Sequence, residues 1–149
     1  MTTRPAAVID TTKFRLSLQR LEERQEDLER LELSAPRWLL ESVTESVIQR
    51  FETCYDCLWK VLKRHLVKRL GVADPPNSPK PIFRLANENH LLEDRVEAWI
   101  GYANARISTS HDYDGEKARA ALELIPDFLD DAIALYKTLT GKRWDPNAP

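Results

Sequence analysis

Apolar residues recur every three or four positions along most of the chain, which is the spacing of one face of an α-helix. The first such stripe follows a candidate N-cap at Thr11 or Thr12 and runs to about Leu33. Its apolar members are Phe14, Leu18, Leu21, Leu28 and Leu31. Charged residues of both signs occupy the other faces, so this segment predicts an amphipathic helix.

A second and longer stripe lies between Ser34 and Gly71. Ser34 is a candidate cap, and Pro36 falls near the first turn, where a missing N–H costs little. Gly71 is the expected stop. The apolar members are Leu40, Val43, Val47, Phe51, Cys54, Leu58, Leu62 and Leu66. The pattern predicts one long helix.

The second half of the chain predicts three further helices after a proline-rich connection. They are a short helix from Ile82 to Leu91, a helix from Leu92 to a break at Asp114 and Gly115, and a last helix that ends at Gly141. Pro126 lies inside the last helix and should kink it.

Together these segments predict an all-α fold, an antiparallel up-and-down four-helix bundle with an extra short helix. A length of 149 residues suits a single domain covering residues 1–149. Residues 1–10 and 142–149 show no periodicity, and we expect them to be loose tails.

Composition narrows the class of protein. The 22 Lys and Arg residues are balanced by 24 Asp and Glu, for a net charge of −2, which argues against a protein that coats DNA. No apolar run approaches the ~20 residues that cross a bilayer, so we expect no membrane span. The N-terminus lacks the apolar core of a signal peptide, and two cysteines make no disulfide framework. A cytoplasmic location follows as an expectation.

Two local motifs in the second helix have competing interpretations. Cys54 and Cys57 form C-x-x-C in mid-helix, which favours small buried side chains over redox or metal chemistry. Lys60, Arg64 and Lys68 are four residues apart and share one helix face. That basic stripe suits contact with RNA or an acidic partner, or is simply a solvated face near a helix C-terminus.

A polar segment near the end of the fourth helix contains Arg106, Ser110, His111 and Tyr113. Arg106 supplies a planar cation for a phosphate, and His111 exchanges protons near neutral pH. Five helical residues separate these two by about 140°. They converge only if the helix loosens near Ser110 or if a second subunit contributes its own copies. The residues predict no metal site, because no cluster has metal-ligand spacing.

The spacing Arg106-x4-His111-x-Tyr113 resembles the R-x4–6-H motif, with its trailing tyrosine, of the HEPN superfamily. More narrowly, the chain resembles the nucleotidyltransferase substrate-binding protein family, relatives of the HepT toxins. The further matching positions are residues 47–52, Tyr55, Trp59, Lys60, residues 81–84, Ala86 and Trp99.

The resemblance implies a homodimeric helical bundle encoded beside a minimal nucleotidyltransferase. HepT-like proteins are metal-independent endoribonuclease toxins without a cofactor, and paired motifs line a cleft between subunits. By this resemblance Arg106 and His111 would be catalytic, with Asn104 and Ser110 in support. Tyr113 would receive the AMP group by which the nucleotidyltransferase neutralises the toxin.

One position departs from the family pattern, which usually has Asn or another polar residue directly after the motif arginine. This chain has Ile107 there, and Asn104 would compensate only with a different geometry. Three functions therefore stay open: a ribonuclease toxin, a non-catalytic binding subunit of the nucleotidyltransferase, and a structural adaptor. Ile107 favours the non-catalytic binding subunit over the ribonuclease toxin.

Overall fold

The computed structural model describes residues 8–31, 33–111 and 115–148, excluding the side chains of Ser110 and His111. All regular elements in these ranges are helices. They are α1 (Thr12–Arg30), α2 (Arg37–Lys68), α3 (Pro79–Glu88), α4 (Val96–His111) and α5 (Gly115–Thr140). The all-α prediction is confirmed, with four long helices and one short one. In the described part of the chain, no helix has the length and apolar character needed to span a membrane.

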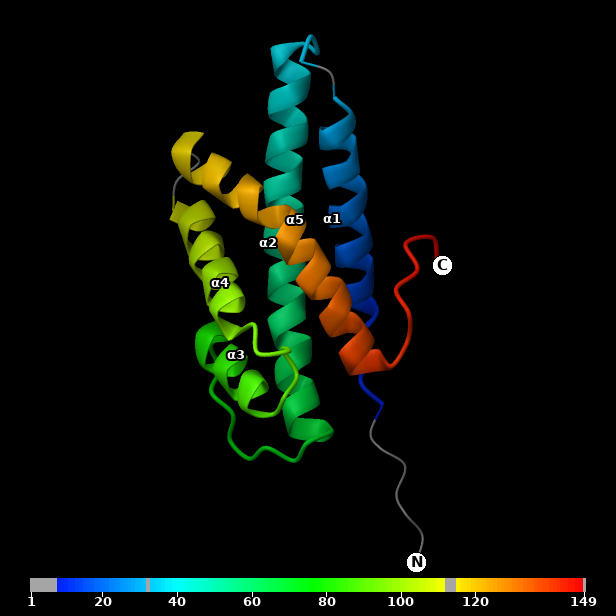
Figure 1. Cartoon of the computed structure of the whole chain (residues 1–149), viewed down its shortest axis with the longest axis vertical. Coiled ribbons are helices and arrows are strands. Elements are labelled where there is room, and N and C mark those ends of the chain that lie inside the picture. Colours follow the sequence, from blue (N-terminus) through cyan, green and yellow to red (C-terminus); the bar gives the residue numbers. More distant parts are fainter. Residues whose placement is uncertain (1–7, 32, 112–114, 149) are drawn as a thin grey trace, which may run out of the picture.

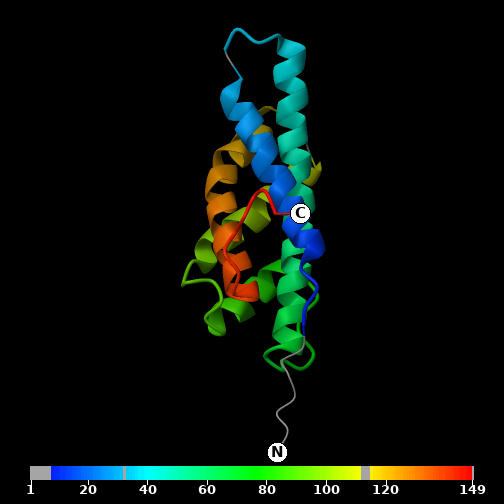
Figure 2. The same ribbon diagram turned by 90° about the vertical axis from the view of Figure 1, so that its right-hand side faces the viewer.

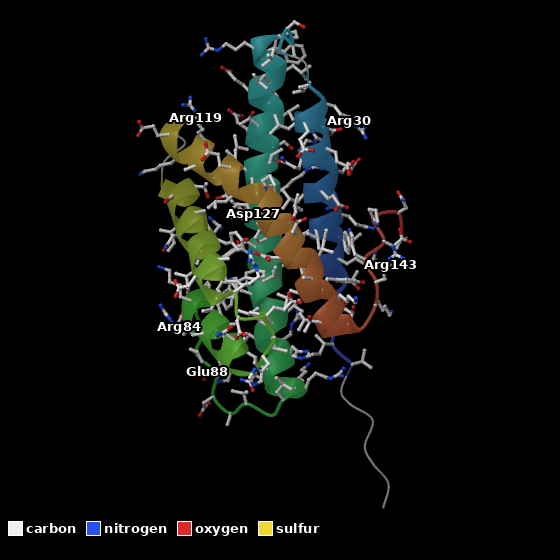
Figure 3. The ribbon with its side chains drawn as sticks, in the orientation of Figure 1. Arg30, Arg84, Glu88, Arg119, Asp127 and Arg143 are labelled. Atoms are coloured by element: carbon white, nitrogen blue, oxygen red, sulfur yellow. The ribbon has the colours of Figure 1, made fainter. Side chains whose placement is uncertain are left out.

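The longest helix, α2, contacts all four others and is the central helix of the bundle. Helices α1 and α2 pack side by side in antiparallel directions, and α5 crosses them obliquely (Figure 1). Helices α3 and α4 cover the other side of the lower half of α2. The charged side chains labelled in Figure 3, Arg30 and Asp127 among them, are exposed on the outside of this bundle.

The core centres on aromatic rings from four helices. Phe51 of α2 packs edge-on against Phe128 of α5, with ring centroids 4.9 Å apart. Trp99 of α4 contacts Phe83 of α3, Tyr102 of its own helix and Phe128. All five side chains are buried, and each is expected to stabilise the fold by roughly 1.5–3 kcal/mol through burial.

A polar contact between α4 and α5 fixes the rotation of α4. Arg95 donates to both carboxylate oxygens of Asp131, at 2.7 Å and 3.0 Å, and the Tyr102 hydroxyl donates to the same carboxylate. One turn further along α4, Arg106 contacts Glu52 and Asp56 of α2, where the candidate site lies.

The helix boundaries differ from the sequence prediction at both ends of α3: it begins at Pro79, three residues before the predicted start at Ile82, because proline is tolerated in the first turn of a helix, and it ends at Glu88. The sequence predicts that one helix ends at Leu91 and the next begins at Leu92, but residues 89–95 form a loop in which His90, Glu93 and Asp94 have positive φ angles. Leu92 is nevertheless buried, which explains why its position matched the apolar pattern. The predicted kink at Pro126 stays a prediction.

The C-terminal segment is anchored, contrary to the loose tail expected from the sequence. The Trp144 indole N–H donates to Glu22 Oε1 at 3.1 Å, and its ring packs edge-on against Tyr136. Gln19 Nε2 donates to the backbone oxygen of Ala148 at 3.0 Å. The segment therefore lies along α1 (Figure 2). Of the expected N-terminal tail, residues 1–7 lie outside the described ranges.

Candidate functional site

Arg106 of α4 is bound by two carboxylates of α2. Its Nη1 lies 2.8 Å from Glu52 Oε2, while its Nε and Nη2 donate to the two oxygens of Asp56 at 3.3 Å and 3.2 Å. Glu52 and Asp56 are four residues apart and therefore share a face of α2. These bonds use three of the five N–H donors of the guanidinium.

The electrostatics keep Arg106 charged. Burial lowers the pKa of its guanidinium, but the hydrogen bond and charge of Asp56 and the charge of Glu52 outweigh this effect, so the pKa is raised. The cluster places two carboxylates around one cation. A phosphate that approaches Arg106 therefore has to compete with carboxylates already in place.

Thr109 completes the cluster and was not identified from the sequence as a functional residue. It is buried, and its Oγ1 lies 3.1 Å both from Glu52 Oε2 and from the backbone oxygen of Arg106. Glu52 and Asp56 were also missed, since they lie fifty or more residues before Arg106. The available signal was their i, i+4 spacing on one face of a helix.

A hollow of about 550 Å³ lies beside Arg106, between α2, α4 and the start of α3. Its walls are mostly apolar. The lining residues are Tyr55, Asp56, Trp59, Ser78, Pro79, Lys80, Pro81, Ala103, Arg106 and Ile107. Ile107, with 51% of its surface exposed, therefore belongs to an apolar wall beside the arginine.

A larger groove of about 810 Å³ follows the C-terminal half of α2 and includes the predicted basic stripe. Lys60, Arg64 and Lys68 are all exposed in it, as the spacing predicted. Lys13 of α1 and Lys63 also line it, and Lys63 donates to Asn77 Oδ1 at 3.0 Å. Asp56 and Trp59 line both this groove and the hollow. The two spaces therefore adjoin.

The other predicted site residues are placed only in part. Asn104 is exposed, and no described contact joins it to Arg106. Helix α4 continues through Ser110 to His111, although the side chains of both residues lie outside the described part of the structure. Tyr113 also lies outside the described residues. Within one subunit, a regular helix keeps His111 about 140° around the axis from Arg106.

The first cysteine of the C-x-x-C pair is not a reactive thiol. Cys54 is fully buried within α2, and burial raises the pKa of its thiol to about 12. The sulfur is therefore a thiol, not a thiolate, at neutral pH, and lacks the nucleophilic form that redox chemistry requires.

Fold and site together define a class of protein: an α-helical bundle with an arginine held by carboxylates beside a cation-lined groove. The chain belongs to the family described as nucleotidyltransferase substrate binding protein like, whose model matches residues 10–141. The resemblance to HEPN and HepT-like proteins found in the sequence is thereby confirmed.

Individual relatives agree with this membership. The protein of Haemophilus influenzae (strain Rd) named probable ribonuclease HepT is 33% identical over 106 residues, or 70% of this chain and 72% of the relative. A Haemophilus influenzae structure reported as the fold of a substrate binding domain of a nucleotidyltransferase has a TM-score of 0.78 at 28% identity, and the match covers 87% of this chain and 98% of that one. A Thermus thermophilus structure has a TM-score of 0.64 at 30% identity, covering 80% of this chain and 98% of that one.

Proposed function

We propose that this chain is the HEPN subunit of a two-gene toxin–antitoxin system and acts in the cytoplasm as a metal-independent endoribonuclease. The observation that carries the proposal is the position of Arg106, in an apolar hollow that adjoins a groove lined by cations. The 33% identical relative named probable ribonuclease HepT supports the same reaction class.

In the proposed reaction, His111 accepts the proton of a ribose 2′-hydroxyl. The 2′-oxygen attacks the adjacent phosphorus, the bond from phosphorus to the 5′-oxygen breaks, and the departing oxygen takes up a proton from water, while His111 later returns its own proton to the solvent. The products are a 2′,3′-cyclic phosphate and a 5′-hydroxyl. Arg106 stabilises the negative charge that develops on the phosphoryl oxygens. To do so, its guanidinium exchanges bonds with Asp56 for bonds with the phosphate.

The reaction requires His111 and Arg106 on one phosphate, and we propose that a homodimer brings them together. The helical backbone of α4 through His111 supports this, because a regular helix in one subunit keeps His111 and Arg106 on different faces. In the dimer, residues 106–113 of both subunits line one cleft. Light scattering at micromolar concentration should give the dimer mass, and a monomer would contradict the proposal.

A cognate minimal nucleotidyltransferase is the proposed antitoxin, and Tyr113 is the proposed acceptor of AMP. The chain has four tyrosines, and the three in the described ranges, Tyr55, Tyr102 and Tyr136, are all buried. AMP on Tyr113 would place a phosphodiester near Arg106 and compete with RNA for its guanidinium. After incubation with the nucleotidyltransferase and ATP, intact mass spectrometry should show added AMP on the wild type and none on Tyr113→Phe. An equal gain on both would rule out Tyr113.

A second candidate function is a non-catalytic substrate- or nucleotide-binding subunit of the nucleotidyltransferase. Two observations favour it: the carboxylates around Arg106, and Ile107 in place of the polar residue that usually follows the motif arginine. In this role the same surface would bind its ligand without cleaving it.

Cleavage of a labelled RNA separates the two functions. His111→Asn should reduce the cleavage rate by about 10²-fold or more if His111 is the general base. His90→Asn is the matched control, because His90 is exposed and asparagine tolerates its positive φ angle. Full activity in His111→Asn would refute the catalytic role, and an inert wild type that still binds RNA would favour the binding subunit.

A further inference from the structure

The two spaces beside α2 adjoin at Trp59, and this arrangement has a consequence for the substrate. Trp59 lines both the hollow that contains Arg106 and the groove that contains Lys60 and Arg64. The Trp59 side chain is half-buried, so its ring is both supported by the core and accessible from the two spaces. The lower, green half of α2 in Figure 1 carries this surface.

Charge favours a polyanion along the groove. Its cations come from two helices and outnumber its two acids, Asp10 and Asp56. They are Lys13, Lys60, Lys63, Arg64 and Lys68. From Asp56 to Lys68 the helix rises about 18 Å, which is the length of about five nucleotides at a stacked spacing of ~3.4 Å. The groove therefore suits a short stretch of phosphate backbone.

The hollow supplies a different chemistry, suited to a base. Tyr55, Trp59, Pro79 and Ile107 give it apolar walls beside the arginine. Bases of single strands bind by stacking on aromatic side chains while cations follow the backbone. In a duplex the same base is paired and stacked, and has to be flipped out before it reaches a side chain.

We propose that this surface is a binding site for single-stranded RNA, in which Lys60, Arg64 and Lys68 bind phosphates along one backbone and Trp59 stacks one base in the hollow beside Arg106. The proposal rests on the proposed function and deepens it, because it names the form of the RNA and the residue that positions it. With one base held on Trp59, the neighbouring phosphate lies next to Arg106.

The binding test uses a fluorescently labelled ten-nucleotide 2′-O-methyl RNA, which lacks the free 2′-hydroxyl needed for cleavage. Trp59→Ala should weaken its binding, measured by fluorescence anisotropy, by about 5- to 150-fold. Trp38→Ala is the matched control, since Trp38 lies on the same helix and is 68% exposed at its other end. Trp38→Ala should bind like the wild type.

Two further measurements separate stacking from loss of the fold and from simple charge. Trp59→Phe keeps an aromatic platform and should bind between the wild type and Trp59→Ala, with the same circular dichroism spectrum. The triple variant Lys60→Gln, Arg64→Gln, Lys68→Gln should lower the slope of log affinity against log salt by about 2, since each phosphate contact on a single strand contributes about 0.7.

Several outcomes would overturn the proposal. One is that the wild type and Trp59→Ala bind the single strand with equal affinity. Another is that Trp59→Ala loses as much affinity for the same oligonucleotide annealed to its complement as it loses for the single strand. A monomeric Trp59→Ala would identify the hollow as an interface between copies. A Trp59→Ala that binds RNA normally and fails to bind the nucleotidyltransferase would identify it as a protein-docking surface. If the wild type binds the probe through Trp59 and cuts no RNA, this proposal stands while the ribonuclease function fails.

Discussion

Arg106 is expected to stabilise the fold as well as to bind phosphate, and a double-mutant cycle with Glu52 tests this. Arg106→Met keeps the apolar stem of the side chain and removes the guanidinium. Glu52→Gln keeps the shape of its partner and removes the negative charge. The side chains are 25% and 14% exposed, respectively, so solvent screens this pair only in part.

The exposure sets the expected magnitude. Arg106→Met leaves the Glu52 carboxylate with the Thr109 hydroxyl as its remaining described donor, and the loss of a charged hydrogen bond costs about 1.5–3 kcal/mol. When Glu52 has already been replaced by Gln, Arg106→Met removes a hydrogen bond to a neutral amide instead of to a carboxylate. In that background it should lower the free energy of unfolding by about 1 kcal/mol. The expected coupling free energy is therefore about 0.5–2 kcal/mol. In a chain of this length, a loss of about 2 kcal/mol lowers Tm by about 4–8 °C.

Urea unfolding followed by circular dichroism, at matched protein concentrations, gives the free energy of unfolding of the wild type, the two single variants and the double variant. The control pair is Arg37 and Glu41, also on α2, with a shorter contact of 2.7 Å and exposures of 91% and 58%. Because solvent screens this pair, Arg37→Met should change the unfolding free energy by less than about 0.5 kcal/mol. A coupling below about 0.5 kcal/mol for Arg106 and Glu52, or equal costs for the two arginines, would refute the reasoning.

Three further predictions concern pH, the C-terminal segment and metals. Burial and the Arg69 charge lower the pKa of His65, so the folded state favours the neutral imidazole. The free energy of unfolding should therefore be highest above pH ~6.5 and should fall as the pH drops below that value. His65→Gln should show a smaller change in Tm between about pH 7.5 and 5.5 than the wild type. Trp144→Ala should cost about 1–3 kcal/mol in urea unfolding, whereas Trp38→Ala should stay within about 0.5 kcal/mol; equal effects would show that the segment adds no stability. No group of three or more possible metal ligands lies among the described residues and the proposed reaction uses none, so EDTA should leave RNA cleavage unchanged; strong inhibition would contradict it.

The sequence was sufficient for the helices because their signal is local. The stripe through Phe51, Leu58 and Leu62 has the helical period, and these residues are buried. Leu40 matched the same period and is 42% exposed, since the first turns of α2 extend beyond the helices that cover the rest. The loop at residues 89–95 was missed because periodicity does not detect positive φ angles at non-glycine residues.

The site was predictable only where its residues form a local motif. Arg106 was found through its spacing to His111, and the basic stripe through its i, i+4 period. The carboxylates that hold Arg106 lie on another helix, and their distance from it depends on how α4 rotates against α2. That rotation is fixed by the contact of Tyr102 with Asp131, a pairing between helices for which no sequence period exists.

The surroundings of Ile107 give the departure from the family pattern a physical meaning. Ile107 and Trp59 line the same hollow, so the residue after the motif arginine extends an apolar wall suited to the face of a base. Binding a base and cleaving the neighbouring phosphate place different demands on this surface: the first needs Trp59 and the groove cations, and the second needs His111 and a guanidinium released from Asp56. Because these residue sets are separate, substitutions that abolish cleavage should leave RNA binding largely intact. The two proposed functions, ribonuclease and binding subunit, would therefore use the same surface and differ in whether the phosphate displaces Asp56 from Arg106.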